Sequence, residues 1–212
     1  MLELDHLVIA ATDLDSGEAW LRERLGTSLA PGGRHPGWGT HNRLLQLGGR
    51  VYLELIAIDP SAPAPAGPRP FGLDDPALQA ALAHAPRLIH WLVRSSDLEA
   101  DLATLAYRPG PPVAMTRGAL RWRITVPADG RPAGEGLLPS VIAWDVPPAE
   151  QPPARLPDAG VRLAALRVQG PPATLGQQPA VNSPVPIEWA HGGRSALAAR
   201  FETPLGQVTL GG

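Results

Sequence analysis

Two histidines occupy equivalent places in two similar stretches of the chain. The stretch DHLVIAATDL, positions 5–14, is repeated in outline as IHWLVRSSDL, positions 89–98, and superposing the two aligns His6 with His90. Imidazole nitrogens bind metals and transfer protons near neutral pH. A histidine on an apolar strand is otherwise a hydrogen-bonded core residue. Its recurrence in both copies favours a shared chemical role.

A third candidate is Glu54, the only charged residue within VYLELIAI. An unpaired buried carboxylate is costly, so Glu54 binds a partner or a metal, pairs with an arginine, or faces solvent. If the two repeated halves pack as pseudo-twofold partners, His6, Glu54 and His90 meet in one cleft. Two imidazoles and a carboxylate suit a divalent ion such as Fe, Mn, Zn or Ni. Glu54 is also a candidate catalytic base.

Polar side chains in two other stretches are candidates for substrate binding. The Gly-rich loop RHPGWGTHNR runs into a strand, and ALRWRITVP alternates arginines with apolar residues, which places both arginines on one strand face. The candidate binding residues are His41, Asn42, Arg43, Arg121 and Arg123. Loop packing explains the first group equally well, and a solvated sheet face explains the second.

The composition excludes several kinds of chemistry. The 212 residues include no cysteine, which excludes disulfides, thiolate metal sites and cysteine nucleophiles. Lysine is absent as well, which excludes Schiff-base chemistry and the phosphate-loop lysine. The motifs of serine hydrolases, dinucleotide-binding proteins and common metalloproteases are not found.

Charge and hydropathy indicate the partners. A formal net charge of -2 gives no electrostatic footprint for nucleic acid or an anionic membrane. The N-terminus has no signal-peptide pattern, and no segment approaches about 20 uninterrupted apolar residues. We therefore expect a cytoplasmic protein that binds a small molecule and neither nucleic acid nor membrane. A homodimer is compatible with the sequence.

Strands and capped helices are predicted to position these residues. Residues 4–11 form an apolar, partly alternating strand, followed by a helix that begins near Thr12 and ends at Gly26. The strands HNRLLQLG and VYLELIAID follow, joined by the turn GGR. In the second copy, a strand around His90 precedes a helix with an S-x-x-E capping box at Ser96. The strands ALRWRITVP and LLPSVIAWDV come next.

Proline-rich stretches separate the predicted units. Residues 59–70 form an extended connector, and Asp75 followed by Pro76 begins a linking helix. A second proline-rich break lies at 147–157, and three further strand-like stretches follow it. We predict an α+β protein in one compact unit. Its parts are a first βαβββ module (1–60), a connector with a linking helix (61–86), a second βαβββ module (87–147) and a C-terminal strand-rich extension (158–212).

Two βαβββ modules, each opening on a strand with a histidine, resemble the vicinal oxygen chelate superfamily of glyoxalases, bleomycin-resistance proteins and dioxygenases. LDHLVIAATDL, HPGWGTHNRLLQLG and YLELIAIDP are similar to the first-module signature of its glyoxalase-like group, and GPPVAMTRGALRWRITVP and ETPLGQVTL to later parts. The resemblance spans nearly the whole chain. It implies curved mixed sheets around a cleft.

The family pattern places metal ligands on the first and last strand of each module. Carried over, these positions fall on His6, Glu54 and His90. The remaining carboxylate position falls near Ser140 to Ala143, where no acid stands.

The resemblance implies a metal-dependent, glyoxalase-like lyase or isomerase acting on a small vicinally oxygenated molecule. The metal would hold two substrate oxygens, and Glu54 would serve as ligand and base. The missing acid leaves two alternatives open. One is a metal-free small-molecule-binding or drug-sequestering protein of the same fold. The other is a non-haem iron dioxygenase with two histidines and one carboxylate.

Overall fold

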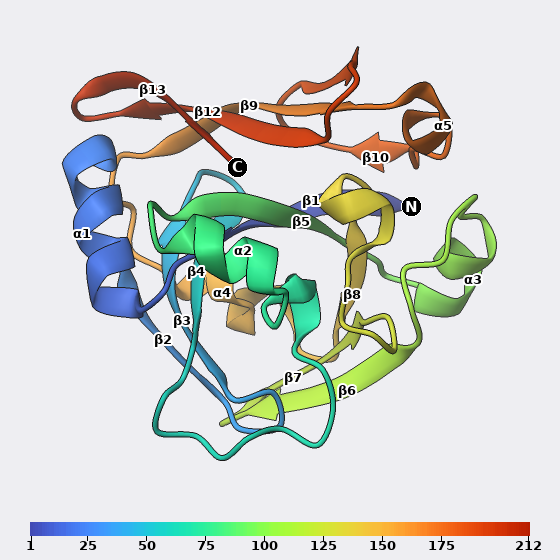
Figure 1. Ribbon diagram of the computed structural model, residues 1–212, viewed down its shortest axis with the longest axis horizontal. Helices are drawn as coiled ribbons and strands as arrows, with labels where there is room; N and C mark the ends of the chain where they lie inside the picture. The colour runs from blue at the N-terminus through green and yellow to red at the C-terminus, as the bar shows by residue number, and fades with distance from the viewer.

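Two βαβββ modules share one strongly curved sheet (Figure 1) in the computed structural model, which describes residues 1–212. The first module comprises β1 (Leu2–Ala10), α1 (Leu14–Leu25), β2 (Ala30–His35), β3 (Thr40–Gln46) and β4 (Tyr52–Ile58). The second comprises β5 (Arg87–Arg94), α3 (Leu98–Ala103), β6 (Pro112–Arg117), β7 (Leu120–Thr125) and β8 (Ser140–Trp144). The modules join where β1 pairs antiparallel with β5. The predicted α+β fold of two βαβββ modules is confirmed.

The strand order is β2-β3-β4-β1-β5-β8-β7-β6, so β2 and β6 are the edge strands. Neither was singled out from the sequence, because APGGRH and PVAMTR carry glycine or proline and little apolar periodicity. Pairing with β3 and β7 holds them in the sheet.

Aspartates cap the helices α1, α2 and α3. Asp75 accepts a hydrogen bond from the Ala77 amide at the start of α2 (Pro76–Leu82), as predicted. The cap of α3 is Asp97, which accepts from the Ala100 amide, and not Ser96 as the sequence suggested. None of the helices is long and apolar enough to cross a membrane.

Replacing Asp13 by alanine should lower the free energy of unfolding by about 1 kcal/mol. Asp13 caps α1: its Oδ1 accepts from the Ser16 amide at 2.8 Å, and its Oδ2 accepts from the Ser16 hydroxyl at 2.7 Å. Urea unfolding at pH 7 measures the loss, and Asp13→Asn is the control because asparagine keeps an acceptor. An unchanged free energy in Asp13→Ala would contradict this role.

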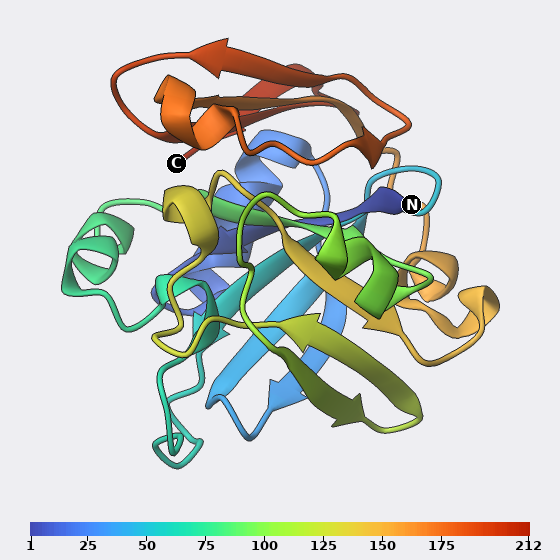
Figure 2. The same cartoon turned by 90° about the vertical axis from the view of Figure 1, so that its right-hand side faces the viewer.

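The C-terminal extension forms a second layer over the central strands (Figures 1 and 2). Its strands are β9 (Arg162–Gly170), β11 (Ile187–His191), β12 (Ala196–Thr203) and β13 (Gly206–Gly211), in the order β11-β9-β12-β13. A short strand, β10 (Val181–Asn182), pairs instead with the start of β1. Leu166 and Phe201 of this layer share one core with Leu7, Leu53 and Trp91. The extension therefore buries the outer face of the main sheet, opposite the cleft.

An irregularity in β1 changes which residues face the cleft. The pairing of β1 with β5 shifts register between Leu4 and His6, and such a bulge turns neighbouring side chains to new faces. Strict alternation along β1 would place Leu4 on the same face as His6. Instead Leu4 packs with Leu7 in the outer core, whereas Val8 lies in the core on the cleft side. The bulge also brings the side chain of Asp5 against that of His6.

Candidate functional site

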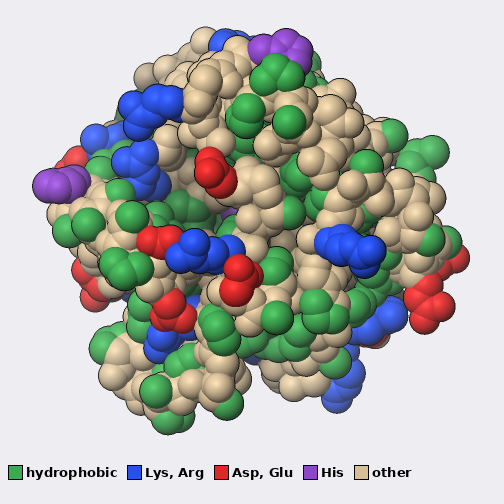
Figure 3. Space-filling view, turned by 45° about the vertical axis from the view of Figure 1, so that its right-hand side comes forward, with side chains coloured by type: hydrophobic (Ala, Val, Ile, Leu, Met, Phe, Trp, Pro, Cys, Tyr) green, Lys and Arg blue, Asp and Glu red, His purple; other side chains and the backbone are tan.

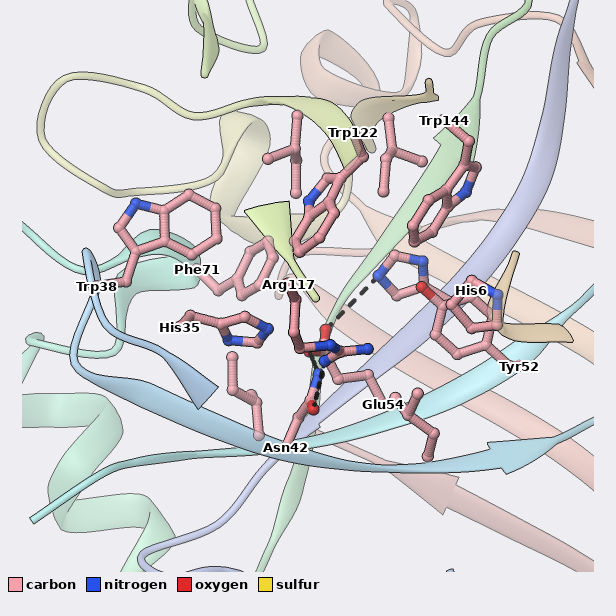
Figure 4. A pocket seen from close by; sticks show the side chains of 15 residues that line it. His6, His35, Trp38, Asn42, Tyr52, Glu54, Phe71, Arg117, Trp122 and Trp144 are labelled. Carbon is pink, nitrogen blue, oxygen red and sulfur yellow. Dashed lines mark hydrogen bonds and ion pairs between the residues drawn. The ribbon is translucent and has the colours of Figure 1, made fainter. Parts of the chain in front are cut away.

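The concave side of the nine-stranded sheet holds a narrow pocket with aromatic walls and a polar floor (Figure 4). Its empty volume is about 460 Å³, including space open to solvent. The aromatic lining residues are Trp38, Tyr52, Phe71, Trp122 and Trp144. The polar ones are His6, His35, Asn42, Glu54 and Arg117. Both modules and the connector contribute side chains.

His6 lies between two carboxylates. Its Nδ1 is 2.6 Å from Asp5 Oδ1, and its Nε2 is 3.6 Å from Glu54 Oε2 (Figure 4). Tyr52 stacks on the ring with 4.5 Å between centroids. Burial alone would lower the pKa of His6, but the hydrogen bonds and charges of Asp5 and Glu54 outweigh it and raise the pKa to about 9. At neutral pH the ring is therefore an imidazolium.

Glu54 is the carboxylate of the pocket floor. Asn42 donates to its Oε1 at 2.5 Å, and Arg117 donates to Asn42 Oδ1 at 3.1 Å. Burial would raise the pKa of Glu54, but His6 and Asn42 lower it to about 2. Glu54 is therefore ionised at neutral pH. Cation and anion thus face each other at the floor, with a second cation, Arg117, above them (Figure 4).

Asp5 contacts the His6 ring at Nδ1, the nitrogen that does not face Glu54. Its Oδ2 accepts from the Trp144 indole at 3.1 Å and lies 3.4 Å from Arg94 Nη1. Trp144 therefore lines the pocket and orients Asp5. The sequence analysis missed Asp5 itself, although an acid beside His6 on a buried strand was an available signal. Arg117 carried no such signal, because only the curvature of the sheet brings β6 over β3.

His90 lies on the cleft side of β5, diagonally across from His6. Across the two strands Val8 pairs with His90 and Leu92 pairs with His6. Each histidine therefore has an apolar residue of the core on the cleft side as its direct cross-strand neighbour. Phe71 covers the His90 ring with 5.4 Å between centroids.

Both ring nitrogens of His90 are used within the second module. Nδ1 is 3.1 Å from the Gly136 carbonyl oxygen, and Nε2 accepts from the Ser140 amide at 3.1 Å. The Ser140 hydroxyl also lies 3.0 Å from Nε2. Burial lowers the pKa of His90 to about 4, so the ring is neutral at pH 7. A neutral ring with one donor and one acceptor nitrogen matches these partners.

The predicted metal set of His6, Glu54 and His90 is not assembled. No group of three or more histidine, aspartate and glutamate side chains is placed to hold a metal ion. Ser140, at the start of the stretch Ser140 to Ala143 where the family pattern needs an acid, binds His90 instead. The residues present therefore do not fit the metal site of the family pattern. They do not form the iron site of two histidines and one carboxylate either.

Of the predicted substrate-binding residues on β3, only Asn42 lines the pocket. Arg43 alternates with it, faces α1 and forms ion pairs with Asp15 and Glu18. His41 also points away, and its Nε2 is buried without a hydrogen-bond partner. His41 and Arg43 therefore lie outside this pocket, because β3 has one face on the pocket and one beneath the helix layer.

The arginines of β7 face away from the pocket. Arg123 pairs with Asp145 at 2.8 Å near the surface, and Arg121 is exposed. Trp122 and Ile124, which alternate with them, line the pocket. The alternation was predicted correctly, but the apolar face, not the basic face, is turned to the site. Arg121 and Arg123 are therefore not substrate-binding residues of this pocket.

Comparison with known proteins identifies the family to which the chain belongs. The family model of the glyoxalase-like domain matches residues 4–179. A hypothetical protein from Staphylococcus aureus is similar in structure, with a TM-score of 0.52 and 15% identity over 80% of this chain and 70% of that chain. No curated protein matches the sequence.

Two methylmalonyl-CoA epimerases are more distant in structure. The Streptomyces coelicolor enzyme, in complex with 2-nitronate-propionyl-CoA, has a TM-score of 0.43 and 20% identity over 69% of this chain and 97% of that chain. The Mycobacterium tuberculosis enzyme has a TM-score of 0.39 and 23% identity over 67% of this chain and 86% of that chain. At these identities the likeness concerns the fold alone.

Proposed function

Since the chain belongs to the family of glyoxalase-like domains, within the vicinal oxygen chelate superfamily, we propose that it is a lyase- or isomerase-type enzyme that moves a proton on a small carbonyl compound. The observation that supports this most is the ionised Glu54 carboxylate, held beside the His6 imidazolium on the floor of a pocket with aromatic walls. A base and an oxygen-stabilising cation side by side are what enolisation of a carbonyl compound requires.

The polar and aromatic groups define a substrate class. Arg117 forms no ion pair with any carboxylate of the chain, and its guanidinium reaches the pocket beside Asn42. It is suited to hold an anionic group of the substrate. Trp38, Trp122 and Phe71 offer flat apolar walls for an organic body. A 2-oxo acid combines these features, because its carbonyl and carboxylate oxygens are neighbours and its body can be aromatic.

The proposed step uses two residues of this chain. Glu54 takes a proton from the carbon next to the carbonyl group, so the C–H electron pair forms the enolate double bond. The carbonyl electron pair moves to the oxygen, which accepts a hydrogen bond from His6 Nε2–H. Return of a proton to carbon completes an isomerisation or an exchange. Before substrate binds, the 3.6 Å contact with His6 keeps Glu54 a weak base. When His6 Nε2–H instead donates a hydrogen bond to the substrate oxygen, its contact with Glu54 weakens and Glu54 becomes more basic.

Hydrogen exchange tests the proposal. We expect the protein to accelerate exchange of the C3 hydrogens of phenylpyruvate for deuterium in D₂O, measured by proton NMR against the rate in buffer. Pyruvate is the matched probe without the aromatic body. Since the donor residues do not fit a metal, exchange should persist in EDTA, and the purified protein should hold no stoichiometric metal. Stoichiometric metal that is lost in His6→Ala, with exchange lost in EDTA, would restore the metal-dependent function.

A metal-free binding protein is the second candidate. The aromatic walls favour it, because they suit retention of a flat molecule whatever the reaction. Binding of phenylpyruvate or other aromatic ligands without any exchange, on 2-oxo acids and 2-hydroxyketones alike, would support this candidate and exclude the enzyme.

Replacing Arg117 by glutamine should weaken phenylpyruvate binding about tenfold or more. A hydrogen bond to a charged group contributes about 1.5 to 3 kcal/mol, and a factor of ten in affinity is about 1.4 kcal/mol. Titration calorimetry measures the affinity. Arg121→Gln is the matched control, because Arg121 faces solvent on the neighbouring strand. Equal losses in both variants would show that Arg117 attracts the anion only through the overall charge of the protein.

A further inference from the structure

A second cleft lies beside the candidate site, between β5, α2 and the C-terminal sheet. Its empty volume is about 1160 Å³, including space open to solvent. The apolar lining residues are Phe71, Leu78, Leu88, Ile89, Leu137 and Leu197. Figure 3 shows a hollow on this side of the molecule with hydrophobic side chains inside and charged side chains around its rim. Nothing in the proposed reaction uses this cleft.

Backbone strain is concentrated at the same place. Phe71 (φ 62°) and Glu135 (φ 57°) are the two non-glycine residues of the chain with a left-handed backbone, and both line this cleft. Such a conformation costs about 1 to 2 kcal/mol per residue and persists where the surrounding structure enforces it, often at ligand sites. Phe71 also lines the first pocket, so the two hollows share one wall.

The charged residues of the rim differ in whether they have a partner of opposite charge. Arg131 pairs with Asp75 at 3.3 Å, and Glu135 is exposed to water. Arg87, at the start of β5, is partly buried and forms neither an ion pair nor a side-chain hydrogen bond. A partly desolvated cation gains most from a counter-charge, whereas an exposed carboxylate keeps its hydration. Arg87 is therefore the partly buried charged side chain of the lining that has no counter-charge, and the charge that complements it is negative.

We propose that this cleft is a second binding site, for a molecule with an apolar chain and one anionic end. The guanidinium of Arg87 holds the anionic end, and the apolar lining holds the chain. Removing apolar area from water contributes about 25 cal/mol per Å², so a chain of several methylene groups adds substantially to the affinity. This site is independent of proton transfer at Glu54, and the failure of either proposal leaves the other standing.

Decanoate is the probe for the test, with the intact chain titrated by NMR and calorimetry. We expect resonance shifts at the cleft residues of β5, α2 and 131–137. Arg87→Gln should weaken decanoate binding about tenfold, because it removes the one charge-assisted contact. Arg108→Gln, an exposed arginine outside the cleft, should bind like the wild type. Decanol should bind wild type and Arg87→Gln equally.

A second variant tests the proposal independently, in case the Arg87→Gln protein does not fold. Leu78→Glu places a charge on the apolar lining from a partly exposed helix position, and it should abolish decanoate binding. Three results would overturn the proposal: decanoate shifts confined to the first pocket, equal affinity in wild type and Arg87→Gln, or equal losses in Arg87→Gln and Arg108→Gln.

Discussion

Glu54→Gln should reduce the exchange rate of phenylpyruvate about a hundredfold to ten-thousandfold, which is the usual contribution of a positioned general base. Glutamine keeps the shape of the side chain and an oxygen that accepts from Asn42, so the pocket floor is preserved. What it removes is the ability to take a proton. Proton NMR under the same conditions as for the wild type measures the change.

Two controls separate a catalytic role from a structural one. The affinity for phenylpyruvate should change far less than the exchange rate, since Arg117 and the aromatic walls remain. Asn42→Leu tests positioning, because it removes the hydrogen bond to Glu54 while leaving that carboxylate in place and adding no charge. It should give an intermediate rate and an altered pH profile. Exchange in Glu54→Gln at the wild-type rate would remove Glu54 from the mechanism.

His6→Leu should lower the free energy of unfolding by about 3 to 5 kcal/mol, as expected when one partner of a buried charged pair is removed. His6 is 3% exposed and is the cation between Asp5 and Glu54, which are 0% and 7% exposed. In the variant, Arg94 still compensates Asp5, but Glu54 keeps only the neutral amide of Asn42 as a direct partner. Denaturant unfolding at pH 6 measures the loss.

The pH dependence of the unfolding free energy tests whether the charges of His6 and Glu54 are the source of this stabilisation. Because folding raises the pKa of His6 from 6.5 to about 9, its stabilisation is complete below pH 6.5 and is lost as the pH rises through 9. Because folding lowers the pKa of Glu54 from 4.5 to about 2, its stabilisation is present above pH 4.5 and is lost as the pH falls through 2. The pair therefore stabilises the wild type most between about pH 4.5 and 6.5.

His90→Leu is the matched control. His90 is buried and neutral, and its replacement removes hydrogen bonds to Gly136 and Ser140. His90→Leu should therefore still lose stability between pH 6.5 and 9 as the wild type does. In His6→Leu that loss should disappear. A pH profile of His6→Leu that parallels the wild type would show that His6 is not charged in the folded protein.

The sequence alone was sufficient to predict two strand-helix-strand modules, the start of the first helix near Thr12, the cap Asp75 and the strand-rich extension. These features depend on local periodicity, capping and turn residues, which act over a few positions of the chain. The residues His6 and Glu54 were also found, because a polar side chain in an apolar strand stands out without knowledge of its neighbours.

Which side chains meet was decided only by the tertiary structure. The bulge at Asp5 arises from pairing with β5, and it sets the face of every residue before it in β1. His90 and His6 occupy equivalent positions in the two repeats, but their surroundings differ. Ser140 and Gly136 form hydrogen bonds with a neutral His90, whereas two carboxylates keep His6 protonated. Arg117 enters the site from an edge strand 63 positions after Glu54 (117 − 54). Such contacts depend on sheet curvature and register, which no stretch of the sequence encodes by itself.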